Sequence, residues 1–379
     1  MLWCRERDGD VHSKPFRVGR AGEYNARSKC ISQYASGGKR RGDCHAHRSG
    51  APGPPRAREK ETVMGEPIRI LISSCLLGEK VRYDGGHRRE GFLVETLGRF
   101  VEWVPVCPEV DCGLPTPREA MRLVGNPAAP RLVTSRGGVD HTERMSGWAR
   151  KKLKELKSLG LCGYICKKDS PSSGMERVKV YGDTGPPARV GAGVFTRAFM
   201  EHFPLVPVEE EGRMNDPVLR EMFIEKVFIL RRFRDLLAAG KTRGGLVAFH
   251  TDHKLLLLSH GRKCYAEMGR LVAGAKGLSL SALYDRYQHL LMEALSARPT
   301  EKKCADVLLH MTGHVRKVLT ADEKQELLEV ISRYRQKLIP LIVPVTLIAH
   351  YVRKYRAPYL ERQVFLNPHP VELLLRNHV

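Results

Sequence analysis

The apolar and polar positions follow one pattern between residues 64 and about 210 and another pattern after that. In the first part, short apolar runs separated by Gly- and Pro-rich turns predict five strands: IRILISSCLL, RFVEWVPVCP, RLVTSRGG, LGLCGYIC and RVKVY. The segment WARKKLKELKSLG, which ends at Gly160, predicts a helix. Strands that alternate with helices predict an α/β fold with a mostly parallel sheet.

From about residue 214 the apolar positions recur with a helical period. NDPVLREMFIEKVFILRRFRDLLAAG begins with Asn215 or Asp216 as the N-cap and places Pro217 at the first helical position. TADEKQELLEVISRYRQKL begins with Thr320 and Glu323 as a capping box. Helical segments are predicted at 246–274, 280–297, 300–318 and 320–351.

The first 63 residues have no apolar period. They are rich in Arg, Gly, Ser and Pro, and they carry 14 basic against 7 acidic side chains. Such a composition buries too little apolar surface to offset chain entropy. We predict that residues 1–63 are a disordered basic tail or a mis-assigned extension, with a nucleic-acid-binding arm as the alternative. An α/β domain at 64–212 and an all-α helical domain at 213–379 are expected to follow.

Charge and cysteine content limit the function classes. Lys and Arg outnumber Asp and Glu by 64 to 42, and the net charge of +22 favours polyanionic partners or anionic substrates. No apolar run approaches the roughly 18 residues of a membrane span. Of the ten cysteines, an odd number follows residue 64, which disfavours a disulfide framework. These features predict a soluble cytoplasmic protein that binds no membrane.

Several cysteines stand where predicted strands end, namely Cys75, Cys107, Cys112, Cys162 and Cys166. In parallel α/β sheets, ligands bind in the crevice at the carboxyl ends of the strands. A metal site is therefore one interpretation of these thiols. The other is packing, because free cysteine is often buried as a small apolar residue. No CxxC pair is present, so the usual zinc and ferredoxin spacings do not apply.

Three ordered motifs, SSCLLGEKVRYDGGHRRE, VPVCPEVDCGLPTPRE and GYICKKDSPSSGMERVKVY, resemble the family of the 2-thiouracil desulfurases. The helical half, with VAFHTDHKLLLLSHGRKCYAEMGRLVA and VLLHMTGHVRK, resembles the YbgA domain, whose function is not established. The first resemblance implies a [4Fe-4S] cluster held by three cysteines with one iron open. That iron would take the sulfur of a thiolated pyrimidine while water replaces it on the ring, without net redox change.

The resemblance implies that the cluster ligands are Cys75, Cys107 and a cysteine at the position where this chain has Ser173. We expect a substitute thiolate from Cys112, which shares a turn with Cys107, or otherwise from Cys166. The alternative is that the cluster is missing and that the scaffold is a non-enzymatic nucleic-acid- or protein-binding protein.

Two residues near these cysteines are candidates for catalysis. Glu109 is predicted as a general acid or base, with an ion pair to Arg118 or Arg82 as the structural alternative. Ser170 is predicted to donate a hydrogen bond to the leaving sulfur, with capping of backbone amides as the alternative. The expected partner is a thiolated base, either free or within a nucleic acid, and the basic side chains add weak polyanion binding.

Overall fold

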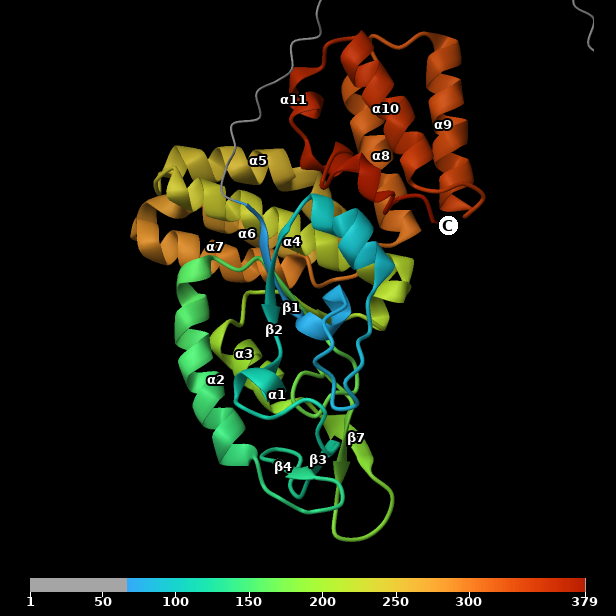
Figure 1. Ribbon diagram of the computed structural model, residues 1–379. Helices are drawn as coiled ribbons and strands as arrows, with labels where there is room; N and C mark the ends of the chain where they lie inside the picture. Colours follow the sequence, from blue (N-terminus) through green and yellow to red (C-terminus); the bar gives the residue numbers. More distant parts are fainter. Residues whose placement is uncertain (1–66, 379) are drawn as a thin grey trace, which may run out of the picture. The chain divides into compact units, whose positions relative to one another are not determined.

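The computed structural model describes residues 67–378, so the prediction for residues 1–63 lies outside the described part. The part of the chain that contains the strands, residues 69–210, precedes a part that contains only helices, as Figure 1 shows. The predicted fold class, an α/β domain with a mainly parallel sheet followed by a helical domain, is confirmed for the described residues.

The first sheet has four parallel strands in the order β2-β1-β5-β8. Its strands are β1 (Arg69–Ser73), β2 (Glu102–Val106), β5 (Gly163–Cys166) and β8 (Val208–Glu210). Ser73 pairs with Val106, and Ile72 pairs with Ile165. The carboxyl ends of β1, β2 and β5 therefore lie at one edge of the sheet. The near-continuous apolar run of β1 fits a strand that is covered on both faces.

The second sheet is mixed and was not predicted as a separate sheet. It has the order β4-β3-β6-β7. Its strands are β3 (Met121–Val124), β4 (Arg131–Thr134), β6 (Val178–Tyr181) and β7 (Ala188–Gly191). β3 and β4 form an antiparallel pair, as do β6 and β7, whereas β3 and β6 are parallel. Two of the predicted strands, RLVTSRGG and RVKVY, thus belong to this sheet and not to the parallel one.

Among the described residues, three α-helices lie between the strands along the chain: α1 (Pro108–Asp111), α2 (Thr142–Leu156) and α3 (Val194–His202). A π-helix spans Phe92–Thr96. After α2, a short 3₁₀ turn leads to Gly160, whose φ of 60° is left-handed, so the helix stop predicted at this glycine is confirmed. α2 and α3 contribute apolar side chains to a core with the first sheet, including Leu153, Phe195, Phe199, Leu71 and Tyr164.

The helical part contains α4 (Pro217–Ala238), α5 (Arg243–His260), α6 (Arg262–Ala273), α7 (Leu280–Ala294), α8 (Glu301–Val315), α9 (Ala321–Arg335), α10 (Ile342–Lys354) and α11 (Pro358–Glu361). The Asp216 carboxylate caps α4, and the capping box of Thr320 and Glu323 is present at α9. The segments predicted as continuous at 246–274 and 320–351 are each two helices. Gly261 separates the first pair, and Pro340 precedes α10 in the second.

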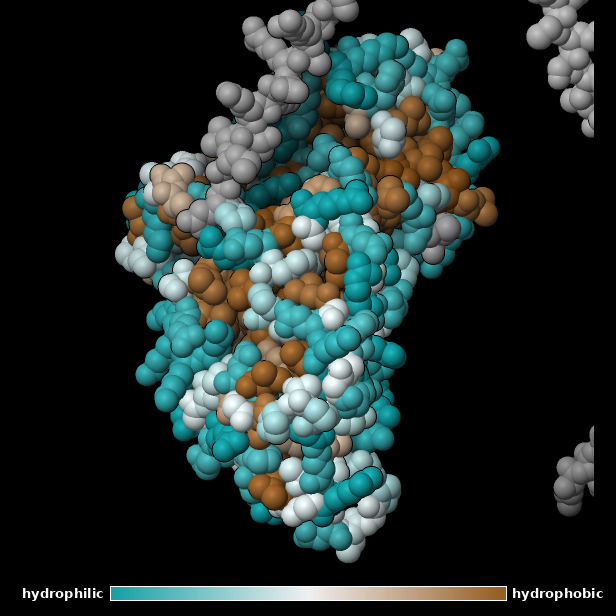
Figure 2. Space-filling view, in the orientation of Figure 1, coloured by the Kyte–Doolittle hydropathy of each residue, from teal (hydrophilic) through white to brown (hydrophobic). Residues whose placement is uncertain are grey.

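Apolar side chains reach the surface near the end of the chain. Figure 2 shows them gathered over the C-terminal helices. Exposed apolar residues of this part of the sequence include Leu338, Val343, Val371 and Leu374. Within residues 67–378, no helix combines the length and apolar character that crossing a bilayer requires.

One buried histidine of α5 makes stability depend on pH. Burial lowers the pKa of His253 to about 3. Its Nδ1 lies 2.7 Å from the Phe249 carbonyl, whereas its Nε2 has no hydrogen-bond partner among the described residues. A histidine in an unfolded chain has a pKa near 6.5. Below that pH the unfolded chain therefore binds a proton at this residue, whereas His253 of the folded chain stays neutral until the pH approaches 3. Stability is therefore lost as the pH falls from about 6.5 toward 3.

We expect His253→Leu to remove this pH dependence. It amounts to a decrease in the free energy of unfolding of about 1.4 kcal/mol for each unit by which the pH falls. The measurement is urea unfolding of wild type and variant at several pH values between neutrality and the onset of acid unfolding. The exposed His310 supplies the control variant His310→Gln. If wild type and His253→Leu lose stability with equal slopes, the assignment to His253 is wrong.

Candidate functional site

Three loops that follow strands of the first sheet surround one cavity of about 400 Å³. They follow β1, β2 and β5, at the edge of a parallel sheet where ligands commonly bind. Cys75 comes from the first loop, Cys107 from the second and Ser173 from the third, and all three residues line the cavity. The structure thus brings together the three positions at which the sequence motifs place cluster ligands.

Cys75 lies in a short 3₁₀ turn directly after β1. The turn ends at Gly78, whose φ of 103° is in the left-handed region. The Cys75 carbonyl accepts from the amide of Arg88 at 2.8 Å, which holds the turn in place. Burial raises the pKa of the Cys75 thiol to about 11, the neighbouring Cys107 adds to this effect, and Lys167 opposes it. A metal that binds Cys75 must therefore displace its proton.

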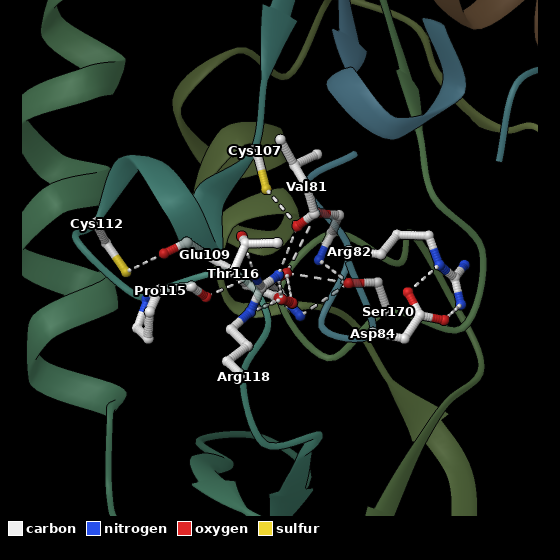
Figure 3. A network of polar contacts seen from close by, with 12 residues as sticks. Val81, Arg82, Asp84, Cys107, Glu109, Cys112, Pro115, Thr116, Arg118 and Ser170 are labelled. Carbon is white, nitrogen blue, oxygen red and sulfur yellow. Dashed lines mark hydrogen bonds and ion pairs between the residues drawn. The ribbon is translucent and has the colours of Figure 1, made fainter. Parts of the chain in front are cut away.

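Cys107 is the N-cap of α1, and Pro108 occupies the first helical position. The Cys107 thiol is directed at the Val81 carbonyl, with a sulfur–oxygen distance of 3.8 Å (Figure 3). Burial raises the pKa of this thiol as well. The two thiols that line the cavity are thus neutral groups whose protons a metal would replace.

The other two predicted thiolates do not line this cavity. Cys112 Sγ contacts the Glu109 carbonyl at 3.3 Å, and Cys112 lines a separate hollow beside α2 (Figure 3). Cys166 is fully buried and contacts the Glu209 carbonyl at 3.5 Å. Across residues 67–378, no group of three or more His, Cys, Asp or Glu side chains could hold a metal ion. The geometry therefore gives no support to either cysteine as the third ligand.

Glu109 forms an ion pair with Arg118 at the cavity wall (Figure 3). Arg118 Nε lies 2.8 Å from Glu109 Oε2, and the side chains are 6% and 14% exposed, respectively. The other carboxylate oxygen, Oε1, accepts from Ser172 Oγ at 2.8 Å. Of the two predicted arginine partners the structure pairs Arg118 with Glu109, whereas Arg82 pairs with Asp84. Glu109 is thus linked both to a buried cation and to a hydroxyl.

Ser170 lines the same cavity, and its hydroxyl organises the loop. Ser170 Oγ accepts from the amides of Ser172 at 3.3 Å and Ser173 at 3.1 Å. The capping alternative is therefore present in the structure. Ser170 Oγ also lies 3.0 Å from Ser172 Oγ. Ser172, which the sequence did not single out, connects Ser170 to Glu109; the only signal for it was its place in DSPSSG.

Lys167 is a second site residue that the sequence did not single out. It lines the cavity, and its ammonium pairs with the Glu211 carboxylate and donates to the Lys168 carbonyl at 3.1 Å. Its amide donates to Ser73 Oγ at 3.0 Å. These contacts hold an ion pair near Cys75, in which Lys167 lowers and Glu211 raises the pKa of the thiol. The basic pair before DSPSSG was the signal for Lys167.

The open side of the cavity has an aromatic ring and basic side chains. Tyr83 lines the cavity with 45% of its surface exposed, and the Arg82 guanidinium lies 5.6 Å from its ring centre. A neighbouring hollow is lined by Arg122, Lys179 and Arg189, and also by Asp169, whose Oδ1 lies 3.7 Å from Arg189 Nη1. A flat ring can stack on an exposed tyrosine, and basic side chains attract phosphate groups.

Two known families match two separate parts of the chain, which agree with the two parts that the sequence motifs indicate. Residues 70–211 match the family described as 2-thiouracil desulfurase. Residues 254–370 match a family described as a protein of unknown function, DUF1722. The first match contains the three strand-end loops of the cavity.

Individual relatives match parts of the chain. The chain is 29% identical over 153 residues to the uncharacterized protein YbgA of Escherichia coli, covering 40% of this chain and 90% of YbgA. It is 34% identical over 113 residues to the uncharacterized protein YbbK of Bacillus subtilis, covering 28% of this chain and 72% of YbbK. A solved structure described as the [4Fe-4S]-dependent thiouracil desulfidase TudS is 30% identical, with 39% of this chain and 94% of that chain covered and a TM-score of 0.34.

Proposed function

The chain belongs to the 2-thiouracil desulfurase family through residues 70–211, and from this premise we propose that it is an iron–sulfur-dependent enzyme that removes sulfur from a thiolated nucleobase. One observation carries the proposal: two cysteines from adjacent strand ends line a single cavity together with a hydrogen-bonded carboxylate. In the net reaction the carbon–sulfur bond is replaced by a carbon–oxygen bond from water, without oxidation or reduction.

Cysteine is present at two of the three positions where the family resemblance implies a cluster ligand. Thiolates are the usual ligands of iron–sulfur clusters, and Cys75 and Cys107 supply two of them. We assign both residues as cluster ligands. When bound, the cluster supplies an open iron that acts as a Lewis acid toward the sulfur of the substrate.

The remaining chemistry is assigned to side chains that line the cavity. Glu109 accepts a proton from the attacking water, either directly or through Ser172, because the Ser172 hydroxyl already donates to its Oε1. Arg118 holds the carboxylate in position from the other side. Lys167, whose ammonium is paired with Glu211, is assigned as a hydrogen-bond donor at the cavity wall, and Ser170 keeps the loop in the shape that presents Ser172.

The open side of the cavity supports the proposed substrate class. A volume of about 400 Å³ accommodates a single pyrimidine ring. Tyr83 offers a stacking surface for it, and Arg122, Lys179 and Arg189 in the adjoining hollow suit a phosphate group. We therefore propose a thiolated base, either free or within a nucleic acid, with weak polyanion binding as an accompanying property.

One observation favours the alternative of a non-enzymatic nucleic-acid- or protein-binding protein. The described residues contain no set of three metal-binding His, Cys, Asp or Glu side chains, since serine stands at the third strand end. Anaerobic purification separates the two functions, because a protein that stays colourless and without iron after reconstitution is not an iron–sulfur enzyme.

Cys75→Ala and Cys107→Ala are each expected to abolish the cluster, because each removes one of the two thiolates that line the cavity. The measurement is iron and acid-labile sulfide per chain after anaerobic reconstitution. Cys112→Ala is the matched control, since Cys112 lies nearby but lines a different hollow. Its cluster content is expected to equal that of wild type. Loss of the cluster in Cys112→Ala would restore the prediction that Cys112 supplies the third thiolate.

A further inference from the structure

A hollow of about 580 Å³ lies where the α/β part meets the helical part. Its wall comes from the segment that leads into β8, from α4 and from the end of α7. Apolar side chains of all three line it, among them Leu205, Val206, Leu219, Met222 and Met292. It shares no lining residue with the cavity of the candidate site. The hollow is therefore a separate place at which a ligand could bind.

The charged and ring side chains of this hollow, apart from one lysine, are either paired within the protein or exposed. Glu209 Oε1 accepts from Arg213 Nε at 2.6 Å. His289 Nδ1 lies 2.8 Å from the Asp285 carbonyl. Glu293 is exposed to solvent on α7.

Lys226 of α4 differs from these groups. It lines the hollow and is partly buried, but its ammonium forms no hydrogen bond or ion pair with any residue between 67 and 378. Burial lowers the pKa of Lys226, Glu209 and Glu225 offset this effect only in part, and Arg213 adds to it. An ammonium that is partly withdrawn from water without a bound partner is in an unfavourable state, which a directly bound anion relieves.

We propose that this hollow binds a small carboxylate with an apolar body. The carboxylate pairs with Lys226, and the apolar body packs against Met222 and Met292, whose flexible side chains adapt to its shape. Pockets for small molecules commonly combine apolar walls with a few polar groups that fix the orientation of the ligand. The net charge of +22 attracts anions, whereas Glu209 and Glu293 in the same lining disfavour a ligand with several negative charges. This inference does not use the proposed function, so each can fail without the other.

The experiment titrates octanoate into the full-length chain at neutral pH and measures binding by isothermal titration calorimetry. Two further probes keep the apolar body and change the head group, namely octanol, which is neutral, and octylammonium, which is positive. The variants are Lys226→Met, which removes the charge, Lys226→Arg, which keeps it, and the control Lys263→Met. Lys263 is an exposed lysine of α6 outside the hollow. Circular dichroism shows whether each variant folds.

Wild type, Lys226→Arg and Lys263→Met are expected to bind octanoate at least roughly 10-fold more tightly than octanol or octylammonium, the factor that a hydrogen bond to a charged group contributes. Lys226→Met should lose this preference. The proposal is wrong if wild type does not bind octanoate at millimolar concentration, or if it binds octanol as tightly. It is also wrong if folded Lys226→Met binds octanoate as wild type does, because the ligand then lies on another apolar surface. If Lys226→Met does not fold, the comparison of the three probes with wild type and Lys226→Arg decides.

Discussion

Glu109→Gln is expected to lower the rate of sulfur removal by about 10²- to 10⁴-fold, the usual contribution of a positioned acid or base. Glutamine keeps the size of the side chain and can still accept a hydrogen bond from Ser172, but it can no longer take a proton from water. The measurement is release of sulfide from a thiolated pyrimidine under anaerobic conditions, normalised to the iron content of each preparation. This normalisation separates a catalytic loss from a loss of cofactor.

The control for this change is Glu95→Gln. Glu95 also pairs with an arginine, with 3.0 Å between its Oε1 and Arg89 Nη2, but it is exposed and lies outside the cavity lining. Its activity should equal that of wild type. Ser172→Ala should lower the rate less than Glu109→Gln, because water can still reach the carboxylate directly. An unchanged rate in iron-loaded Glu109→Gln would remove Glu109 from the reaction.

Local signals in the sequence were sufficient to predict several helix ends. Asp216 with Pro217 and Thr320 with Glu323 act through backbone groups within three residues, so their effect is visible in a short window. The second sheet depends on distant pairs, such as that between Leu123 of β3 and Val180 of β6. No local period contains such a pair, and each strand of this sheet is only four residues long.

At the candidate site, too, local features could be predicted from the sequence, whereas features that depend on distant contacts could not. The positions of Cys75 and Cys107 after apolar runs were sufficient to predict that they follow strands. The direction of Cys112 depends on the single turn of α1, which faces it toward α2 and away from the cavity. Cys166 is the last residue of β5, and its thiol contacts the Glu209 carbonyl of β8. This contact depends on the pairing of β5 with β8. The spacing of residues along the sequence predicts neither the direction of the Cys112 side chain nor that of the Cys166 side chain.

The helical part contains a buried ion pair that the sequence pattern did not reveal. His260 Nε2 lies 2.6 Å from Glu225 Oε1, and its Nδ1 lies 2.7 Å from the Ala297 carbonyl. Arg376 Nη2 lies 3.7 Å from Glu225 Oε2. Burial raises the pKa of Glu225, but His260, Arg376 and the nearby His369 outweigh it, so the pKa lies below its usual value. Glu225 is therefore the counter-charge of His260, and it shares Arg376 with Glu221, whose Oε1 lies 3.1 Å from Arg376 Nε.

Glu225→Gln is expected to lower the free energy of unfolding by about 3–5 kcal/mol, because removing the carboxylate of a buried ion pair leaves His260 without a counter-charge, whereas Arg376 keeps Glu221. His260 and Arg376 are 1% and 5% exposed, so water cannot replace the lost carboxylate. Urea unfolding at neutral pH, followed by helical circular dichroism, measures the loss. Because the pKa of Glu225 is depressed in the folded chain, its contribution is present above the unfolded value and disappears as the pH falls through the folded one. The difference in the free energy of unfolding between wild type and variant should therefore become smaller at acidic pH.

Glu301→Gln provides the comparison, since it removes the same kind of group from an ion pair with Lys337 near the surface. Exposed pairs of this type contribute less than about 1 kcal/mol. A double variant, Glu225→Leu with His260→Leu, tests the cause, because replacing both partners with apolar groups restores stability where the penalty comes from an uncompensated charge. Recovery of part of the loss would confirm that cause, whereas a double variant as unstable as the sum of both single changes would assign the loss to packing.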